Sequence, residues 1–178
     1  YEEFISNFPN DENIPYVILK SGECYEKLSL SLDRDQEYTY KAHERYSLLI
    51  GRFPQSQYAK EAESKKRGLE QKLADRELYV GEFYFKTYEY NACILRLEYL
   101  LKNYPDSKGT DKALYYLSRA YAELGNFEKS EYYKEKLRKE YPKSPFAGQL
   151  RAERRKLKEI KEEPEKSVKT EVEKKTEK

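Results

Sequence analysis

Apolar residues recur along this chain at helical spacing, and four copies of one short motif separate the apolar runs. Each copy has an aromatic residue, then proline, then a serine or aspartate two positions later. The aromatic fits as the last core residue of a helix, and proline prevents that helix from continuing. The serine or aspartate can cap the next helix. The copies are Phe8-Pro9-Asn10-Asp11, Phe53-Pro54-Gln55-Ser56, Tyr104-Pro105-Asp106-Ser107 and Tyr141-Pro142-Lys143-Ser144.

The spacing of these motifs indicates a repeat of helical hairpins. The four prolines are separated by 45, 51 and 37 residues, whereas a tetratricopeptide repeat has a period of about 34 with proline near its end. The chain therefore has one near-period and two repeats with insertions. Small, aromatic and large apolar residues occupy the expected interior positions, although Lys134 stands where an apolar residue is usual. The matching positions are Gly81, Tyr84, Cys93, Leu97 and Leu100, then Leu117, Ser118, Tyr121, Gly125, Phe127 and Leu137.

The pattern predicts eight helices, and the fourth is long enough to serve two repeats. Their ranges are 1–8, 15–31, 37–53, 57–86, 88–104, 109–124, 126–141 and 145–162. The predicted fold is all-α: a tetratricopeptide-repeat superhelix of about five helical hairpins, formed by residues 1–162. Residues 163–178 are mostly lysine, glutamate, threonine and valine, and we expect a disordered charged tail.

Composition and charge narrow the possible partners. The chain is 38% charged with a mean hydropathy of −1.09, yet 15% of it is aromatic, including 19 tyrosines. Disordered chains lack aromatics, so this mixture favours thin packed layers. From residue 151 onwards there are 11 Lys/Arg and 8 Asp/Glu, a net +3 that leaves −1 for the remainder of a +2 chain. The body has no basic stripe, and we expect no nucleic-acid partner.

The residues that usually carry chemistry are few. The chain has two cysteines, Cys24 and Cys93, and one histidine, His43, without a metal-ligand spacing or a phosphate-binding loop. Both cysteines fall on predicted apolar helix faces. This favours two buried free thiols over a disulfide, which stays an alternative. We expect neither metal nor cofactor, and no enzymatic activity. No apolar run approaches the roughly 20 residues that span a bilayer.

One segment interrupts the repeat pattern, and it carries a family resemblance. The segment is Asp33-Arg34-Asp35-Gln36, and further matches follow at Glu77 and at Arg96-Leu97-Glu98. Together these residues resemble the BamD/ComL family, the lipoproteins of the outer-membrane β-barrel assembly machinery, over about residues 1–146. The Asp-Arg-Asp-Gln step and the joined helix through Glu77 are the specific parts, because generic tetratricopeptide repeats lack both. The matching residues are Asp33-Arg34-Asp35-Gln36, Thr39, Ala42, Leu73-Ala74, Glu77, Gly81, Phe83-Tyr84, Tyr90, Ala92, Arg96-Leu97-Glu98 and Leu124-Gly125.

The resemblance implies a periplasmic scaffold on the inner face of the outer membrane. Its lipid anchor would be a cysteine upstream of Tyr1, and other assembly lipoproteins are possible partners. Family members receive unfolded barrel precursors at their N-terminal repeats. Their C-terminal repeats dock a POTRA domain of the barrel subunit, and Arg96 matches the arginine that faces it, with Glu98 close by. The alternative for Arg96 is an exposed ion pair with Glu98 or Glu89.

The segment Asp33, Arg34, Asp35 and Gln36 also has two interpretations. It could form the rim of a precursor groove lined by tyrosines such as Tyr16 and Tyr38, while Tyr25 and Tyr46 belong to the core. Alternatively, and preferably, it caps the helix that begins near Glu37. Two other scaffold proteins are alternatives to the barrel-assembly hypothesis. One is the Tol-Pal-associated coordinator of envelope constriction, and the other is a cytoplasmic chaperone adaptor with a basic carboxylate clamp. The acidic body disfavours the adaptor.

Overall fold

The computed structural model describes residues 1–152, and these residues form helices and connecting turns without a strand. The predicted all-α fold is confirmed. The predicted helix 145–162 is helical from 145 to the end of the described part, and the predicted tail 163–178 lies outside it. The helices are α1 (Glu2–Asn7), α2 (Ile14–Leu28), α3 (Glu37–Arg52), α4 (Ala59–Lys86), α5 (Tyr90–Asn103), α6 (Thr110–Glu123) and α7 (Phe127–Glu140).

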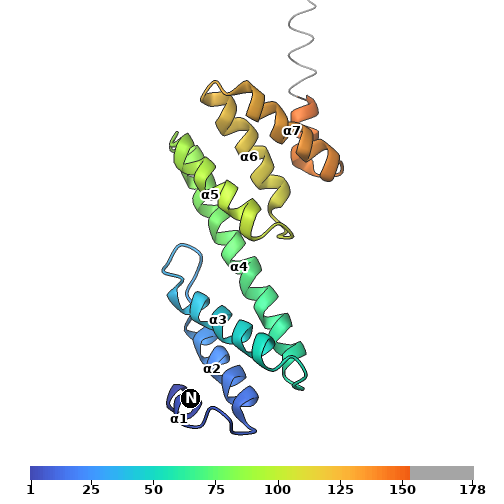
Figure 1. The fold of residues 1–178 in the computed structure, drawn as a ribbon. Coiled ribbons are helices and arrows are strands. Elements are labelled where there is room, and N and C mark those ends of the chain that lie inside the picture. The colour runs from blue at the N-terminus through green and yellow to red at the C-terminus, as the bar shows by residue number, and fades with distance from the viewer. Residues whose placement is uncertain (153–178) are drawn as a thin grey trace, which may run out of the picture.

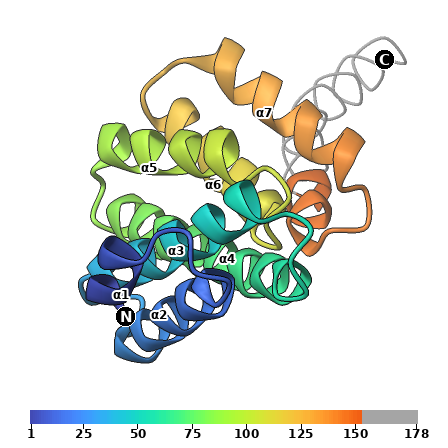
Figure 2. The same cartoon turned by 60° about the horizontal axis from the view of Figure 1, so that its bottom comes forward.

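Successive helices pair antiparallel and stack into an elongated superhelix (Figure 1). The pairs are α2 with α3, α4 with α5, and α6 with α7. The short α1 packs beside α2 at one end, and the helical residues 145–152 pack against α6 and α7 at the other (Figure 2). This arrangement is the tetratricopeptide-like superhelix that the repeat predicts.

The aromatic–proline motif ends four helices in the same way. Phe8, Phe53, Tyr104 and Tyr141 follow α1, α3, α5 and α7, with φ between −128° and −134° and ψ of 56° or 57°. The backbone N–H of each donates to a carbonyl four residues earlier, at 2.8–3.0 Å. Because proline cannot extend the helix, the chain turns at these points. The motif serine acts after the turn, and Ser144 Oγ accepts from the N–H of Phe146 at 3.1 Å.

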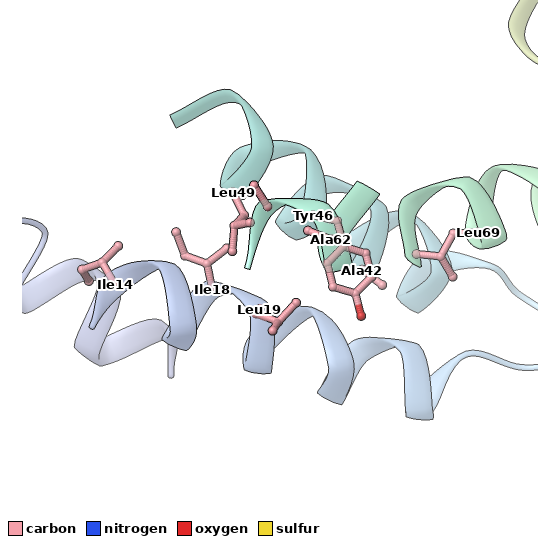
Figure 3. Close-up of a cluster of buried hydrophobic side chains, with 9 residues drawn as sticks. Ile14, Ile18, Leu19, Ala42, Tyr46, Leu49, Ala62 and Leu69 are labelled. Atoms are coloured by element: carbon pink, nitrogen blue, oxygen red, sulfur yellow. The ribbon is translucent and has the colours of Figure 1, made fainter. Parts of the chain in front are cut away.

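The first hydrophobic core lies between α2, α3 and the start of α4 (Figure 3). Tyr46 is fully buried at its centre and donates its hydroxyl to Glu26 Oε2 at 2.7 Å. Gly22 lies against the ring, since a Cβ built there would be 2.5 Å from Tyr46 Cε1. The small residue and the tyrosine therefore form one interlocking pair between α2 and α3. The buried members are Ile14, Ile18, Leu19, Ala42, Tyr46, Leu49, Ala59, Ala62 and Leu69.

Helix α4 connects this core to a second one. It has 28 residues, which corresponds to about 42 Å at 1.5 Å per residue. Its first half supplies Ala59, Ala62 and Leu69 to the first core, and its second half supplies Ala74 to the second core, with α5 and α6. The long helix that the sequence predicts at 57–86 is confirmed, and it serves as the spine of the molecule.

The close contact at Gly22 gives a stability test. We expect Gly22→Ala to lower the free energy of unfolding by about 1–3 kcal/mol, because the buried Tyr46 ring must shift to accept a methyl group. Gly68→Ala in α4 is the matched control, since no atom lies within 4 Å of its Cβ position. It should raise stability by about 0.5–1 kcal/mol through helix propensity. Urea unfolding of both variants checks this, and equal effects would contradict the interlocked pair.

Candidate functional site

Arg96 lies on α5 and pairs with a buried carboxylate on α4. Its Nη1 is 3.4 Å from Glu77 Oε2, and Arg76 Nη1 is 3.8 Å from the other oxygen of that carboxylate. Glu77 is only 3% exposed, whereas the Arg96 side chain is 46% exposed. The alternative pairing of Arg96 with Glu98 or Glu89 is therefore wrong. The arginine is held at its inner edge and presents its outer edge to solvent.

Two exposed tyrosines accompany Arg96. Tyr99 lies one turn further along α5, and Tyr40 on α3 is close enough for Tyr99, Glu77 and Arg96 to act on its phenol. The phenol pKa of Tyr40 is raised, first by burial and then by the nearby Tyr99 and Glu77. Sequence reasoning missed both tyrosines, although the position of Tyr99 three residues after Arg96 is a usable signal. We call Tyr40, Arg96 and Tyr99 the Arg96 patch.

Glu98, the second predicted docking residue, joins three helices. Its Oε1 accepts the hydroxyl of Tyr121 on α6 at 2.6 Å and that of Tyr133 on α7 at 3.0 Å. The two rings stack with centroids 5.6 Å apart and an interplanar angle of 8°. Lys129 Nζ lies 3.2 Å from the Tyr121 hydroxyl. Glu98 therefore makes its hydrogen bonds to other helices of the stack.

The Asp33–Gln36 segment forms a hydrogen-bonded turn before α3. Gln36 is buried, and its Nε2 donates to the carbonyls of Ser31 and Arg34 at 2.8 and 3.0 Å, while its Oε1 accepts from Thr39. Asp35 Oδ1 accepts the N–H of Glu37 at 2.6 Å. The segment is thus a structural turn, but the predicted capping holds only for Asp35. Gln36, at the N-cap position, makes no side-chain bond to the helix backbone.

The charged residues of the same segment face solvent. Asp33 and Arg34 are exposed, and Asp33 accepts a hydrogen bond from Ser31 Oγ at 2.5 Å. This bond is the main cause that lowers the carboxyl pKa of Asp33. The outer edge of the turn, unlike Gln36, is open to a ligand.

The predicted groove tyrosines lie at opposite ends of the α2–α3 hairpin. Tyr16 is near the start of α2 and contacts the Tyr58 ring at 5.6 Å. Tyr38 is near the start of α3 and stacks on Tyr25 at 6.1 Å. Tyr16 and Tyr25 are nine residues apart along α2, a rise of about 13 Å. The structure therefore does not bring Tyr16 and Tyr38 together, although both are partly exposed.

A cavity that the sequence did not predict lies beside the middle of α4. Its volume is about 620 Å³, and the α5–α6 connection forms its opposite wall. Gln71 Oε1 accepts the backbone N–H of Lys108 at 3.0 Å and so joins the two walls. The lining residues are Arg67, Gly68, Glu70, Gln71, Asn103, Tyr104, Pro105, Asp106, Ser107 and Lys108.

The two cysteines are free, and they differ in exposure. Cys93 is buried, and burial raises its thiol pKa to about 12. Cys24 is exposed, so the prediction that it is buried was wrong: it falls at the edge of the apolar face of α2. His43 Nε2 lies 3.1 Å from Glu70 Oε1. Residues 1–152 contain no cluster of His, Cys, Asp and Glu side chains suited to a metal ion, and none of their helices could span a membrane.

Comparison with known proteins adds the family. A family model described as outer membrane lipoprotein, YfiO, matches residues 1–137. The chain belongs to this family. The outer membrane protein assembly factor BamD of Rickettsia prowazekii is 29% identical over 143 residues, which are 80% of this chain and 57% of that protein. The BamD of Caulobacter vibrioides is 27% identical over 124 residues, 70% of this chain and 41% of its own length.

A third relative is matched over a similar share of its length. The BamD of Buchnera aphidicola is 30% identical over 141 residues, 71% of this chain and 56% of that protein. The chain thus spans about half the length of the curated relatives that it matches. The resemblance noted from the Asp-Arg-Asp-Gln turn and the joined helix agrees with this family membership.

The turn before α3 offers a test of its structural role. We expect Gln36→Ala to lower the free energy of unfolding by about 2–3 kcal/mol, because two carbonyls and the Thr39 hydroxyl lose a buried partner. Asp33→Ala, in the same turn, should leave the unfolding midpoint nearly unchanged because this side chain is exposed. Chemical denaturation of both variants measures the difference. Equal losses would argue against the central role of Gln36.

Glu98 can be tested in the same way. Glu98→Ala should cost about 2 kcal/mol of stability, since two tyrosine hydroxyls lose a charged acceptor. Tyr121→Phe and Tyr133→Phe each remove one of these bonds and should cost about 1 kcal/mol. Glu135→Ala on the exposed face of α7 serves as the control. A Glu98→Ala variant as stable as this control would show that the network does not hold α5, α6 and α7 together.

Proposed function

We propose that this chain is a non-catalytic scaffold for the assembly of outer-membrane β-barrel proteins. The observation that carries the proposal is the family match over residues 1–137, together with relatives named as outer membrane protein assembly factors. The family description also supports a location at the outer membrane. In this proposal a lipid anchor upstream of Tyr1 tethers the periplasmic domain, and other assembly lipoproteins join it.

We propose that the Arg96 patch docks a POTRA domain of the barrel subunit. Arginine and tyrosine are the residue types that most often dominate binding energy at protein interfaces. Glu77 holds Arg96 in place, so little side-chain freedom is lost when a partner binds. The exposed edge of the guanidinium can then pair with a carboxylate of the partner. Glu98 contributes to this surface by keeping α6 and α7 in position behind α5.

We propose that the N-terminal hairpin receives unfolded precursors. Asp33, Arg34 and Asp35 present charge at the outer edge of the turn before α3, and Tyr38 lies directly after it, stacked on Tyr25. Tyrosines supply apolar area and a hydroxyl at low entropic cost, which suits an extended polypeptide. Tyr16 offers a second contact at the far end of the hairpin. The buried hydrogen bonds of Gln36 hold the backbone of this turn in place.

Binding to the purified POTRA array of the barrel subunit tests the docking proposal. We expect binding by the wild-type chain, and at least about tenfold weaker binding by Arg96→Glu, since the reversed charge repels the partner carboxylate. Arg96→Gln should weaken binding less. Isothermal titration calorimetry at moderate salt measures the three dissociation constants.

Two controls keep this result interpretable. Lys60→Glu makes the same kind of charge reversal on an exposed residue in the first turn of α4, and it should leave the affinity unchanged. Thermal unfolding must show that Arg96→Glu is folded, because its new carboxylate lies beside the buried Glu77. Absence of wild-type binding at micromolar concentration would refute the docking proposal. Unchanged affinity of Arg96→Glu would remove only Arg96 from the interface.

A further inference from the structure

Two helix–helix turns of this chain have the same backbone conformation. After α4, the N–H of Glu89 donates to Tyr84 O at 2.9 Å and the N–H of Tyr88 donates to Phe85 O at 3.2 Å. After α6, Asn126 and Gly125 repeat these two bonds to the carbonyls five and three residues before them, at 2.9 and 3.0 Å. This is the hydrogen-bond pattern of a Schellman turn, whose central residue is left-handed. Both turns lie at the same end of the stack (Figures 1 and 2).

The two turns differ in the residue at the left-handed position. Gly125 has φ of 76° and Tyr88 has φ of 65°; Tyr88 is the one non-glycine residue with positive φ in the described part of the chain. Glycine adopts this conformation without steric cost, whereas a side chain with a Cβ does so with strain. Tyr88 therefore occupies, in the turn after α4, the position that glycine occupies in the turn after α6.

Internal packing does not account for the tyrosine at this position. Tyr88 is 77% exposed, the highest value among the exposed large hydrophobic side chains of residues 1–152. Its ring meets the Tyr90 ring edge-on, with centroids 6.3 Å apart. A side chain that is strained and still points into solvent is more characteristic of a binding contact than of a folding contact.

The exposed ring nevertheless has one aromatic neighbour that leads to the interior. Tyr90, below it, packs on Phe85 at 5.6 Å, and Phe85 packs on Tyr116 of α6 at 5.1 Å. This line of aromatic rings connects Tyr88 to the second hydrophobic core. The left-handed backbone of the turn sets the direction in which Tyr88 projects. A tyrosine has only two side-chain torsions to order when it enters a pocket of a partner, which is the property of a strong interface contact.

The surroundings of Tyr88 favour a protein over a lipid surface. The neighbouring turn exposes Leu124 (45%) and Phe127 (73%) at the same end of the molecule. The exposed charges of the two turns are the acids Glu89, Glu123 and Glu128 and the bases Lys86 and Lys129. The acids exceed the bases by one, so the two turns lack the cluster of basic residues that draws a protein to an anionic membrane. A protein surface with an apolar pocket and basic residues around it is complementary.

We propose that Tyr88 is a specificity-determining contact for a protein domain that docks on the turns after α4 and α6. The partner is the POTRA domain proposed above for the Arg96 patch, so this inference rests on that proposed function. Arg96 lies six residues after the first residue of α5, a rise of about 9 Å. An interface of standard size covers about 800 Å² on each partner, which is enough to include both residues.

A single substitution separates the binding role of Tyr88 from a folding role. Tyr88→Gly relieves the left-handed strain and removes the exposed ring. We expect its unfolding midpoint to rise by about 2–4 °C, while its affinity for the purified POTRA array falls at least about tenfold. Tyr88→Phe should retain most of the affinity. Tyr1→Ala, which removes an exposed ring at the distant N-terminal end of the described chain, should not change it.

The outcomes distinguish this inference from the proposed function. If the wild-type chain does not bind the POTRA array, both are refuted. If it binds and Tyr88→Gly binds equally well, only the role of Tyr88 is refuted. A lower unfolding midpoint for Tyr88→Gly would show that the tyrosine serves folding. Binding of the wild-type chain to phosphatidylethanolamine–phosphatidylglycerol vesicles that Tyr88→Gly abolishes would make this end of the molecule a lipid contact and overturn the inference.

Discussion

The structure depends on the packing of one uninterrupted helix against two separate cores. Helix α4 buries Ala62 and Leu69 among α2 and α3, and further along it buries Ala74 among α5 and α6. Since the contacts between the first hairpin and the later helices pass mainly through α4, its straight backbone sets how the two halves face each other. The proposed precursor rim and the proposed docking surface are thereby held at a fixed separation.

Buried or half-buried carboxylates connect the layers where the apolar cores are thin. Glu26 accepts the Tyr46 hydroxyl, Glu98 accepts those of Tyr121 and Tyr133, and Glu77 lies between two arginines. A chain with 19 tyrosines needs such acceptors, because each buried hydroxyl must find a partner. The burial of Tyr46 and its bond to Glu26 both raise the phenol pKa, so its proton stays in this bond at neutral pH.

Single residues were enough to predict where helices begin and end. They were not enough to predict which side chains are buried and which residues meet across helices. The aromatic–proline motifs marked four helix ends. The prediction failed for Cys24, because the edge of an amphipathic face cannot be placed to within one residue without knowing what packs on it. Likewise no local pattern could pair Arg96 with Glu77, which is 19 positions earlier and meets it only when the hairpin closes.

By itself, the sequence determined the helical hairpins, the long α4 and the family resemblance, because these depend on periodicity and on residues that stop or start helices. Only the tertiary structure decided which polar groups meet across helices. It assigned Glu98 to an internal network, separated Tyr16 from Tyr38, and placed Tyr88 in a left-handed turn without glycine. Such contacts depend on the rotation of one helix relative to its neighbour, which is set by the whole packed layer rather than by nearby residues.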